Sequence, residues 1–194
     1  MNFDAVADAV DALGGIKMPI TSAEVKYINE YINETARITG KQSKNITSAG
    51  TYTLDGVQAV AYSRIRYTSG GDYKRTERMR DVITAMLTKL KTKSVSQINN
   101  IADKILPQVY TNLSMSDLIT MIPALASFNV AESIGWPYET KGATIGGVWY
   151  SVPSTLESNV EGLHKEVFKN ENYEVPEKVM TINRKIVNKT GYSK

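Results

Sequence analysis

The chain has no cysteine, a single histidine and no long run of apolar residues. Without cysteine it can form no disulfide, no thiolate metal site and no cysteine nucleophile. No apolar stretch reaches the roughly 18 residues typical of a membrane-spanning helix, and no secretory signal opens the sequence. We therefore expect the chain as given to be soluble. We expect the single histidine, His164, to be a partly buried structural residue rather than a catalytic one.

The sequence also lacks any run of five or six like charges, although its formal net charge is +3 and its pI is about 8.9. Nucleic-acid-binding domains usually present a broad basic stripe, so nucleic acid is not an expected partner. No spacing typical of metal ligands is present. What the chain does have is 194 residues, 42% of them hydrophobic, which suits one domain with an appendage.

Hydrophobic periodicity and capping signals predict mostly helices. In chain order we expect a helix from Phe3 to Leu13 that ends at Gly14, a strand from Ile16 to Ile20, a helix opened by a capping box at Thr21 and Glu24, a polar connection over 38–53 and a short helix capped by Asp55. We then expect a long helix from Asp72, helices near 98–109 and 114–122, an extended region over 131–153 whose Trp136, Trp149 and Tyr150 pack into core and loops, a helix over 156–167 and a polar tail with one short helix.

Arginine is concentrated in one window, residues 62–80. Six cations stand there against two anions, a local surplus of 6 − 2 = +4, so the rest of the chain is about neutral. The cations are Arg64, Arg66, Lys74, Arg75, Arg78 and Arg80, and the anions are Asp72 and Glu77. Because the rigid guanidinium fork binds phosphate in a bidentate way, this window predicts a site for a multiply charged anion such as phosphate.

The register of the long helix supports this interpretation. Arg75 and Arg78 fall at spacings of three and four from Met79 and Val82, so they continue the core-facing stripe into the first turn. Cations at a helix N-terminus oppose the macrodipole, so an anion is expected there. Asp72, predicted as the N-cap, can offset only part of this charge.

Two further expectations concern the neighbouring basic residues. Arg64 and Arg66 lie two residues apart, so their side chains point to the same side if that piece is extended. Lys74 and Arg80 are expected to face solvent. The alternative to an anion site is a solvated basic face or a set of structural ion pairs.

These residues resemble a known family. The segment from Leu54 through Asp55-Gly56 to Arg64 and Arg66, followed by Asp72, Arg75 and Arg78, resembles the arginine signature of the LytR-CpsA-Psr (LCP) family. The opening stretch from Asn2 to Ile16, with its Leu-Gly-Gly motif, is similar to the segment that precedes that signature. Met79 stands where the family commonly has glutamine. Residues 143–168 are similar, more weakly, to extensions of some members.

The resemblance implies an α/β fold, a mixed sheet flanked by helices, here partial and helix-rich, with a hydrophobic tunnel for a polyprenyl chain. Residues 1–110 would be the C-terminal half of the catalytic domain and residues 111–194 a helical and extended extension. The family's first half, with a membrane helix, central strands and acidic Mg²⁺ ligands, would lie outside this sequence.

The resemblance also implies a function. Such proteins transfer polyprenyl-pyrophosphate-linked glycopolymers, such as teichoic acid or capsule, to peptidoglycan at the extracytoplasmic face of the membrane of Gram-positive bacteria, usually with Mg²⁺. By carry-over Arg64, Arg66, Arg75 and Arg78 would bind the pyrophosphate, and Arg64, Arg66, Asp72 and Arg75 would form the catalytic set. Two alternatives remain: a non-catalytic module that binds polyprenyl pyrophosphate or wall polymer, and an unrelated phosphate-binding regulatory domain.

Overall fold

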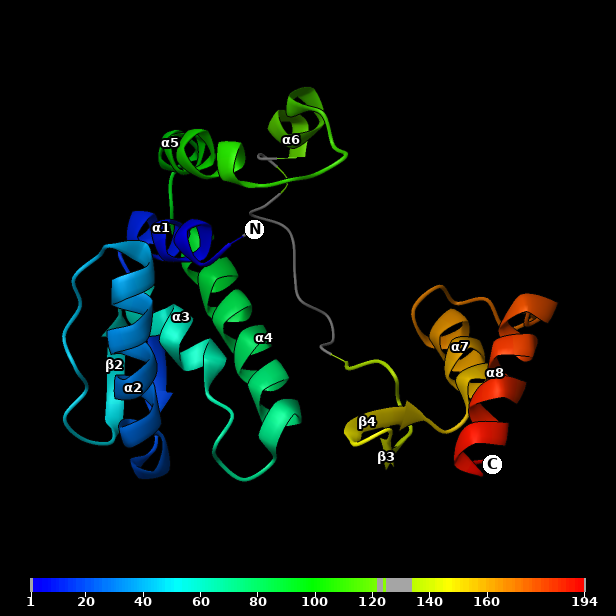
Figure 1. Cartoon of the computed structure of the whole chain (residues 1–194). Helices are drawn as coiled ribbons and strands as arrows, with labels where there is room; N and C mark the ends of the chain where they lie inside the picture. Colours follow the sequence, from blue (N-terminus) through cyan, green and yellow to red (C-terminus); the bar gives the residue numbers. More distant parts are fainter. Residues whose placement is uncertain (1, 122–123, 125–133, 194) are drawn as a thin grey trace. The chain divides into compact units, whose positions relative to one another are not determined.

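The computed structural model describes residues 2–121, 124 and 134–193, and the chain divides into two compact units, Met1–Ala131 and Glu132–Lys194. The boundary at 110/111, as the end of a catalytic half, stays a prediction. The first unit contains α1 (Phe3–Leu13), β1 (Ile16–Ile20), α2 (Ser22–Thr39), β2 (Gly50–Leu54), α3 (Gly56–Arg64), α4 (Gly71–Leu90), α5 (Val95–Ile105), the short 3-10 helix η1 (Leu106–Gln108) and α6 (Met115–Met121) (Figure 1). The second unit contains β3 (Thr140–Ile145), β4 (Val148–Pro153), α7 (Leu156–Glu166) and α8 (Glu177–Thr190).

Local signals start and stop the first helices as predicted. Gly14 ends α1 in the left-handed conformation, with φ 79°. The capping box of α2 forms, because the backbone N–H of Thr21 donates to the Glu24 carboxylate at 2.9 Å. Asp55 caps α3 by accepting from the backbone N–H of Gln58 at 2.8 Å. The predictions for these three helix ends are confirmed.

The sheet of the first unit differs from expectation. β1 pairs with β2 in an antiparallel register that joins Ile16 to Leu54 and Ile20 to Gly50. The prediction of a polar connection over 38–53 was therefore wrong for its last residues, 50–53, which belong to β2. Gly50–Leu54 has a single buried residue, Leu54, and the strand is recognisable only through its pairing with β1. The helix-rich α/β class is confirmed; within the described ranges the strands form two separate antiparallel pairs.

The core of the first unit lies where α2, α3 and the β1–β2 pair meet. Helix α3 is buried along most of its length and packs against α1, α2 and α4. Gly56 permits its close approach to α1, because a Cβ at this position would lie 2.1 Å from the carbonyl oxygen of Ala7. α3 is therefore a fixed support for Arg64 at its C-terminal end.

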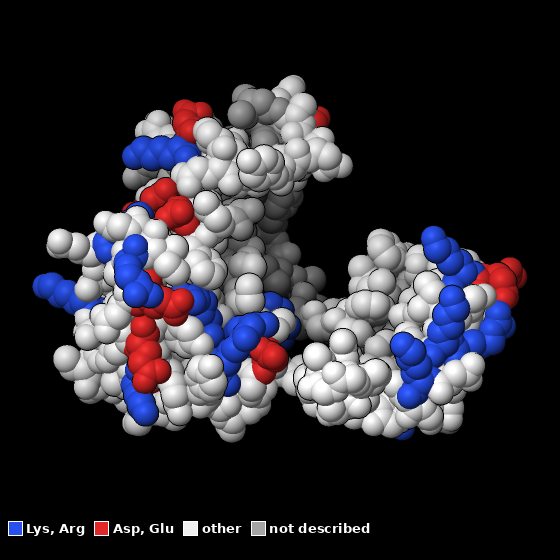
Figure 2. Space-filling model, viewed as in Figure 1, with Lys and Arg blue, Asp and Glu red and all other residues white. Residues whose placement is uncertain are grey.

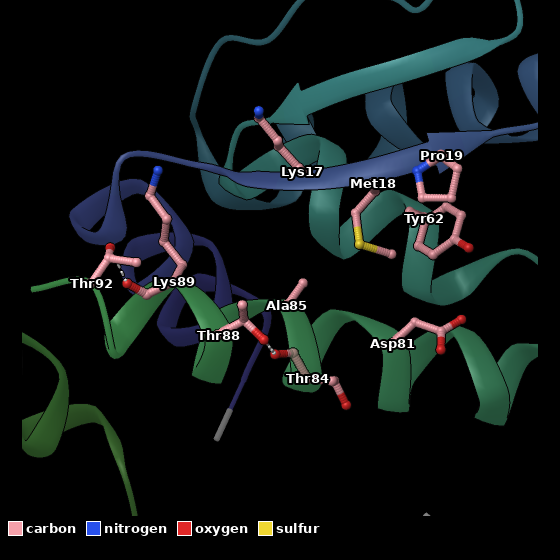
Figure 3. Close-up of a pocket in the computed structure, with 10 residues that line it drawn as sticks. All are labelled: Lys17, Met18, Pro19, Tyr62, Asp81, Thr84, Ala85, Thr88, Lys89 and Thr92. Atoms are coloured by element: carbon pink, nitrogen blue, oxygen red, sulfur yellow. Dashed lines mark hydrogen bonds between the residues drawn. The ribbon is translucent and has the colours of Figure 1, made fainter. Parts of the chain in front are cut away.

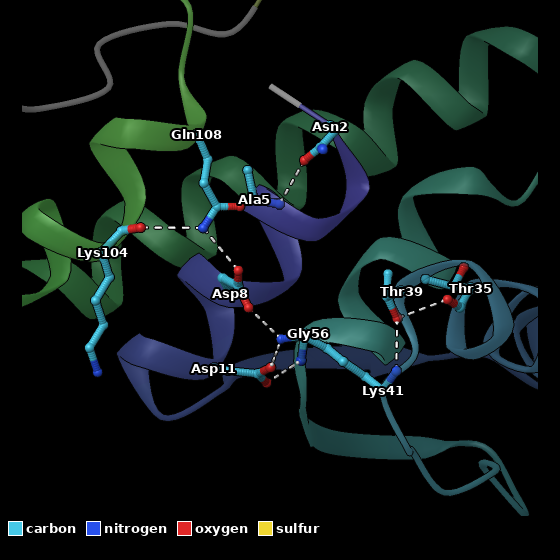
Figure 4. A network of polar contacts seen from close by, with 10 residues as sticks. All are labelled: Asn2, Ala5, Asp8, Asp11, Thr35, Thr39, Lys41, Gly56, Lys104 and Gln108. Atoms are coloured by element: carbon cyan, nitrogen blue, oxygen red, sulfur yellow. Dashed lines mark hydrogen bonds and ion pairs between the residues drawn. The ribbon is translucent and has the colours of Figure 1, made fainter.

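A polar network holds the N-terminal helix to three other segments (Figure 4). The ammonium group of Lys41 donates to Asp8 at 2.6 Å and to Asp11 at 2.9 Å. Asp11 also accepts from the backbone N–H of Gly56 at 2.7 Å, and Gln108 donates to Asp8 at 2.9 Å. The hydrogen bond from Lys41 lowers the pKa of Asp8. Residues far apart in the sequence thereby fix α1 relative to α3 and η1.

The second unit is a β-hairpin followed by two packed helices. β3 pairs with β4 through a turn at Gly146 and Gly147, and the buried side chain of Asn159 holds α7 to the hairpin by bonding both the N–H and the carbonyl of Glu139. Asn183 of α8 accepts from the first backbone N–H of α7 at 3.0 Å. The predicted polar tail thus contains a full helix of 14 residues.

Aromatic side chains of the second unit are more exposed than predicted. Trp136, Trp149 and Tyr150 are all exposed within the described part of the chain, so the expectation of core packing was wrong. Trp149 lies across Gly142 on the opposite strand instead of entering a core. No helix among the described residues is both long enough and apolar enough to cross a membrane.

Candidate functional site

The loop between α3 and α4, residues 65–70, carries the candidate site. α3 ends at Arg64 and α4 starts at Gly71, with Gly70 in the left-handed conformation as its N-cap. The expectation that Asp72 caps α4 was therefore wrong, since Asp72 is already helical and its carboxylate makes ion pairs. Arg64 is helical, so the extended conformation that would place the side chains of Arg64 and Arg66 on one side is not present.

Arg64 is held on the α2 side of the loop. Its guanidinium pairs with Glu34 at 3.0 Å and donates to the hydroxyl of Thr35 at 3.0 Å. The same guanidinium lies between two rings, 4.7 Å from the centroid of Phe3 and 4.8 Å from that of Tyr31. Stacking and hydrogen bonding together fix the orientation of this cation.

Arg66 and Arg75 share one carboxylate. The same oxygen of Asp72 lies 3.2 Å from Nε of Arg66 and 3.3 Å from a terminal nitrogen of Arg75. Nε of Arg75 is buried and has no hydrogen-bond partner in the protein. A buried donor without a partner is unfavourable, so Arg75 retains an unsatisfied capacity for an acceptor such as a phosphate oxygen.

Arg78 lies beneath this pair and is almost fully buried. Its Nε donates to Glu24 at 2.8 Å, and the two side chains are only 3% and 7% exposed. The terminal nitrogens donate to the carbonyl of Ile65 at 3.1 Å and to the hydroxyl of Thr68 at 2.7 Å. Arg78 thus ties α4 to α2 and fixes the loop on which Arg66 lies. Its predicted contact with substrate stays a prediction.

Tertiary contacts reduce the charge surplus of the arginine window. Four arginines, Arg64, Arg66, Arg75 and Arg78, form ion pairs with three carboxylates, Glu24, Glu34 and Asp72. These seven side chains together have a formal charge of 4 − 3 = +1. The rest of this unit mixes both signs on the face shown in Figure 2. The remaining positive charge is centred on Arg66 and Arg75, which share one anion. We call Arg64, Arg66 and Arg75 with Asp72 the arginine cluster.

An apolar groove of about 710 Å³ runs along α4. Its walls are aliphatic side chains and methionines, with one hydroxyl, Ser63. They are Val6, Ala9 and Leu13 of α1, Met79, Val82, Ile83, Met86, Leu87 and Leu90 of α4, Ile98, Ile101, Ala102 and Ile105 of α5, and Leu106 and Met121. The predicted apolar stripe of α4 therefore lines this groove.

None of the arginines lines the groove, but some residues that line it adjoin the arginine cluster along the chain. Arg75 lies one turn before Met79 on the same face of α4, and Arg64 follows Ser63 directly in α3. On α1, Phe3 lies one turn before Val6, and its ring contacts the Arg64 guanidinium. Apolar groove residues thus lie within one helical turn of two arginines, an arrangement that suits an amphiphile with an anionic head.

A second cavity, of about 570 Å³, lies between β1 and the opposite side of α4 (Figure 3). Met18, Tyr62 and Asp81 contribute to its walls. Burial raises the pKa of Tyr62 to about 12 and raises the pKa of Asp81. The arginines are not among the residues that line this cavity.

Sequence reasoning identified the arginines and Asp72 but missed the other two carboxylates that pair with the arginines, Glu24 and Glu34. Glu24 was recognised only as half of a capping box, and no sequence signal pointed to Glu34 or Tyr31. His164 is half-buried and stacks on Tyr173 with ring centroids 3.4 Å apart, in keeping with its predicted structural role. Among the described residues no group of three or more His, Cys, Asp or Glu could hold a metal ion. The residues that the structure describes thus do not fit an Mg²⁺ site.

The chain is similar to known proteins in sequence and in fold. A profile of the LytR_cpsA_psr family, the LytR-CpsA-Psr (LCP) family, matches residues 1–165. The chain is 33% identical over 145 residues to the polyisoprenyl-teichoic acid–peptidoglycan teichoic acid transferase TagT of Bacillus subtilis, which covers 73% of this chain and 42% of TagT. The chain spans about two fifths of the length of this relative.

Solved structures share the fold. A protein described as transcriptional regulator EF0465, from Enterococcus faecalis, superposes with a TM-score of 0.67 at 20% identity, over 100% of this chain and 66% of that one. YwtF (TagT) of B. subtilis with bound octaprenyl pyrophosphate lipid superposes with a TM-score of 0.50 at 22% identity, over 98% and 57%. Because the family profile matches most of its length, residues 1–165, this chain belongs to the LytR-CpsA-Psr family.

Proposed function

We propose that this chain forms the pyrophosphate- and lipid-binding part of an enzyme that transfers a polyprenyl-pyrophosphate-linked glycopolymer, of the teichoic acid or capsule type, to peptidoglycan by phosphoryl transfer. The observation that carries the proposal is the closeness of apolar groove residues to the arginine cluster, in which Nε of Arg75 is buried without a partner: Met79 of the groove lies one turn after Arg75, and Ser63 directly precedes Arg64. The reaction belongs at the extracytoplasmic face of the membrane, where the lipid carrier and peptidoglycan meet.

The side chains have different roles in this proposal. Arg66 and Arg75 bind the pyrophosphate oxygens, and Asp72 orients both guanidinium groups through its shared oxygen. Arg64 adds positive charge from a position fixed by Glu34 and two aromatic rings. Such preorganised cations stabilise the charge that develops during phosphoryl transfer. We assign Arg78 to holding the loop, since its donors are occupied by Glu24, Ile65 and Thr68.

Mg²⁺ is implied by the family resemblance. When bound, such an ion would neutralise phosphate charge. The described residues offer no ligand set for it, so we derive no step through it. Every assigned role belongs to side chains of this chain.

A second candidate is a module that binds the lipid without turning it over. All three carboxylates in contact with the four arginines are engaged in ion pairs. None of these three is therefore free to act as a general base on an incoming hydroxyl. This observation favours binding without catalysis for the chain by itself.

Thermal unfolding in the presence of octaprenyl pyrophosphate tests both candidates. We expect the melting temperature to rise with lipid concentration, because a ligand that binds only the folded state stabilises it. Dependence of the shift on Mg²⁺ would favour the transferase, and a shift of equal size without Mg²⁺ would favour the binding module. No shift at any lipid concentration would contradict both.

Substitution of Ile83 by asparagine should weaken lipid binding without unfolding the protein. Ile83 lines the groove but is 56% exposed, so the core loses little when the side chain becomes polar. We expect the dissociation constant for octaprenyl pyrophosphate to rise by about tenfold, as measured by titration. Val95→Asn, at a similar exposure of 58% outside the groove, is the matched control. Equal changes of the dissociation constant in both variants would contradict the assignment of the groove as the lipid site.

A further inference from the structure

Three tyrosines lie beside the arginine cluster and have no place in the function proposed above. Tyr27 and Tyr31 are one turn apart on α2, and Tyr67 follows Arg66 in the loop between α3 and α4. The rings of Tyr27 and Tyr67 have centroids 5.9 Å apart and are tilted by 38°. Tyr67 is 68% exposed, so its side chain is accessible to a ligand. We call these three residues the tyrosine cluster.

The tyrosine cluster and the apolar groove contact Arg64 from different helices. Phe3, one turn from the groove residue Val6, stacks on Arg64 with its centroid 4.7 Å from the guanidinium carbon. Tyr31 of α2 contacts the same guanidinium at 4.8 Å. Arg64 thus contacts one ring beside the groove, Phe3, and one ring of the tyrosine cluster, Tyr31.

The two flanking surfaces differ in chemistry. Apart from Ser63, every residue that lines the groove is aliphatic or methionine, and none is aromatic. The tyrosine cluster has only aromatic rings, each with a hydroxyl group. An isoprenoid chain needs no hydrogen bonds, whereas a sugar has apolar C–H faces that stack on rings and hydroxyls that need polar partners. The groove therefore suits the lipid, and the tyrosines suit a sugar.

We propose that the tyrosine cluster is the subsite for the first sugar that is attached to the pyrophosphate. This inference rests on the proposed function, because it takes the arginine cluster as the pyrophosphate site. A polyprenyl-pyrophosphate-linked saccharide has its lipid, its charged group and its sugar in the same order as the groove, the arginines and the tyrosines. Tyr67, the most exposed of the three, provides the stacking face, and Tyr27 supports it from α2.

Binding of two lipids to the 194-residue chain tests this subsite. The first probe is octaprenyl pyrophosphate, and the second is the same lipid with one N-acetylhexosamine on its terminal phosphate. We expect the wild-type chain to bind the sugar-bearing lipid about three- to tenfold more tightly. In Tyr67→Ala this preference should vanish, while the affinity for the bare lipid stays as in the wild type. Tyr67→Phe should keep most of the preference, since the stacking ring remains.

Tyr110→Ala is the matched control, because Tyr110 is 98% exposed and its replacement should alter neither affinity. Equal loss of both affinities in Tyr67→Ala would mean that Tyr67 contacts the lipid or the phosphate, and would overturn the inference. Unchanged affinities in Tyr67→Ala would overturn it as well, while leaving the pyrophosphate site intact. Failure of the wild-type chain to bind either lipid would overturn the proposed function and the inference together.

Discussion

Replacement of Arg75 by alanine should weaken the binding of octaprenyl pyrophosphate by about ten- to a hundredfold. Hydrogen bonds between charged groups contribute roughly 1.5–3 kcal/mol each, and Arg75 is the cation whose Nε is buried without a protein partner. The variant also leaves Asp72 with only Arg66 as its cation, so more of its negative charge would then oppose the pyrophosphate. Titration of the lipid into the purified protein measures the change in dissociation constant.

Two variants separate this effect from a general loss of positive charge. Arg80→Ala removes one cation from the same helix but outside the arginine cluster, and should change the affinity by less than about threefold. Arg75→Lys keeps the charge but loses the planar fork, so its affinity should lie between those of the wild type and Arg75→Ala. If Arg80→Ala and Arg75→Ala lost affinity for octaprenyl pyrophosphate equally, the site would be a diffuse basic surface rather than a defined pyrophosphate site.

Replacement of Arg78 by alanine should destabilise the first unit by about 3–5 kcal/mol. Removal of one partner leaves the Glu24 carboxylate buried without its cation, which is more costly than the loss of an exposed ion pair. The loop around Ile65 and Thr68 also loses two hydrogen bonds. Urea unfolding followed by circular dichroism measures the free energy of unfolding.

The controls for Arg78 use a surface pair and a double variant. Lys74→Ala breaks the exposed pair with Glu77 and should cost less than about 1 kcal/mol. Glu24→Gln combined with Arg78→Met removes both buried charges and should be less destabilising than the two single changes added together. Additive effects would mean that Arg78 and Glu24 do not act as a pair.

The same pair predicts how stability depends on pH. Burial raises the pKa of Glu24, but the hydrogen bonds from Thr21 and Arg78 outweigh burial, so the pKa is lowered overall. A lowered pKa in the folded state means that the unfolded chain binds the proton first on acidification. The pair therefore contributes its full stability above the ordinary glutamate pKa of about 4.3, and this contribution is lost as the pH falls further. In Arg78→Met the loss of stability below pH 5 should be smaller.

Much of this architecture could be predicted from the sequence because the signals are local. Gly14, the Thr21–Glu24 capping box and Asp55 act within one helical turn, and they end or begin helices in the structure as predicted. The spacing of Arg75 and Arg78 against Met79 and Val82 likewise depends only on helix geometry. The burial of Arg78 followed from that register, whereas the Arg75 side chain stays 28% exposed.

Other features depend on contacts between distant segments. β2 is a strand because β1 lies beside it, and its own polar residues gave little sign of this. The anion that Arg78 needs is Glu24, 54 residues away in the sequence, and Arg64 is neutralised by Glu34 of the same helix α2. No periodicity within residues 62–80 could identify either partner.

The sequence by itself determined which residues are available: an arginine-rich window, an apolar stripe on one long helix, and the motifs that place the chain in its family. Only the tertiary structure decided their roles, because ion pairing depends on which side chains meet in space. In the fold Arg78 is a buried support and Arg75 has an unsatisfied donor. The rings of Phe3 and Tyr31, from two different helices, both contact the Arg64 guanidinium. Arginines that look equivalent in the sequence have different roles in the folded protein, because their burial and their ion-pair partners differ.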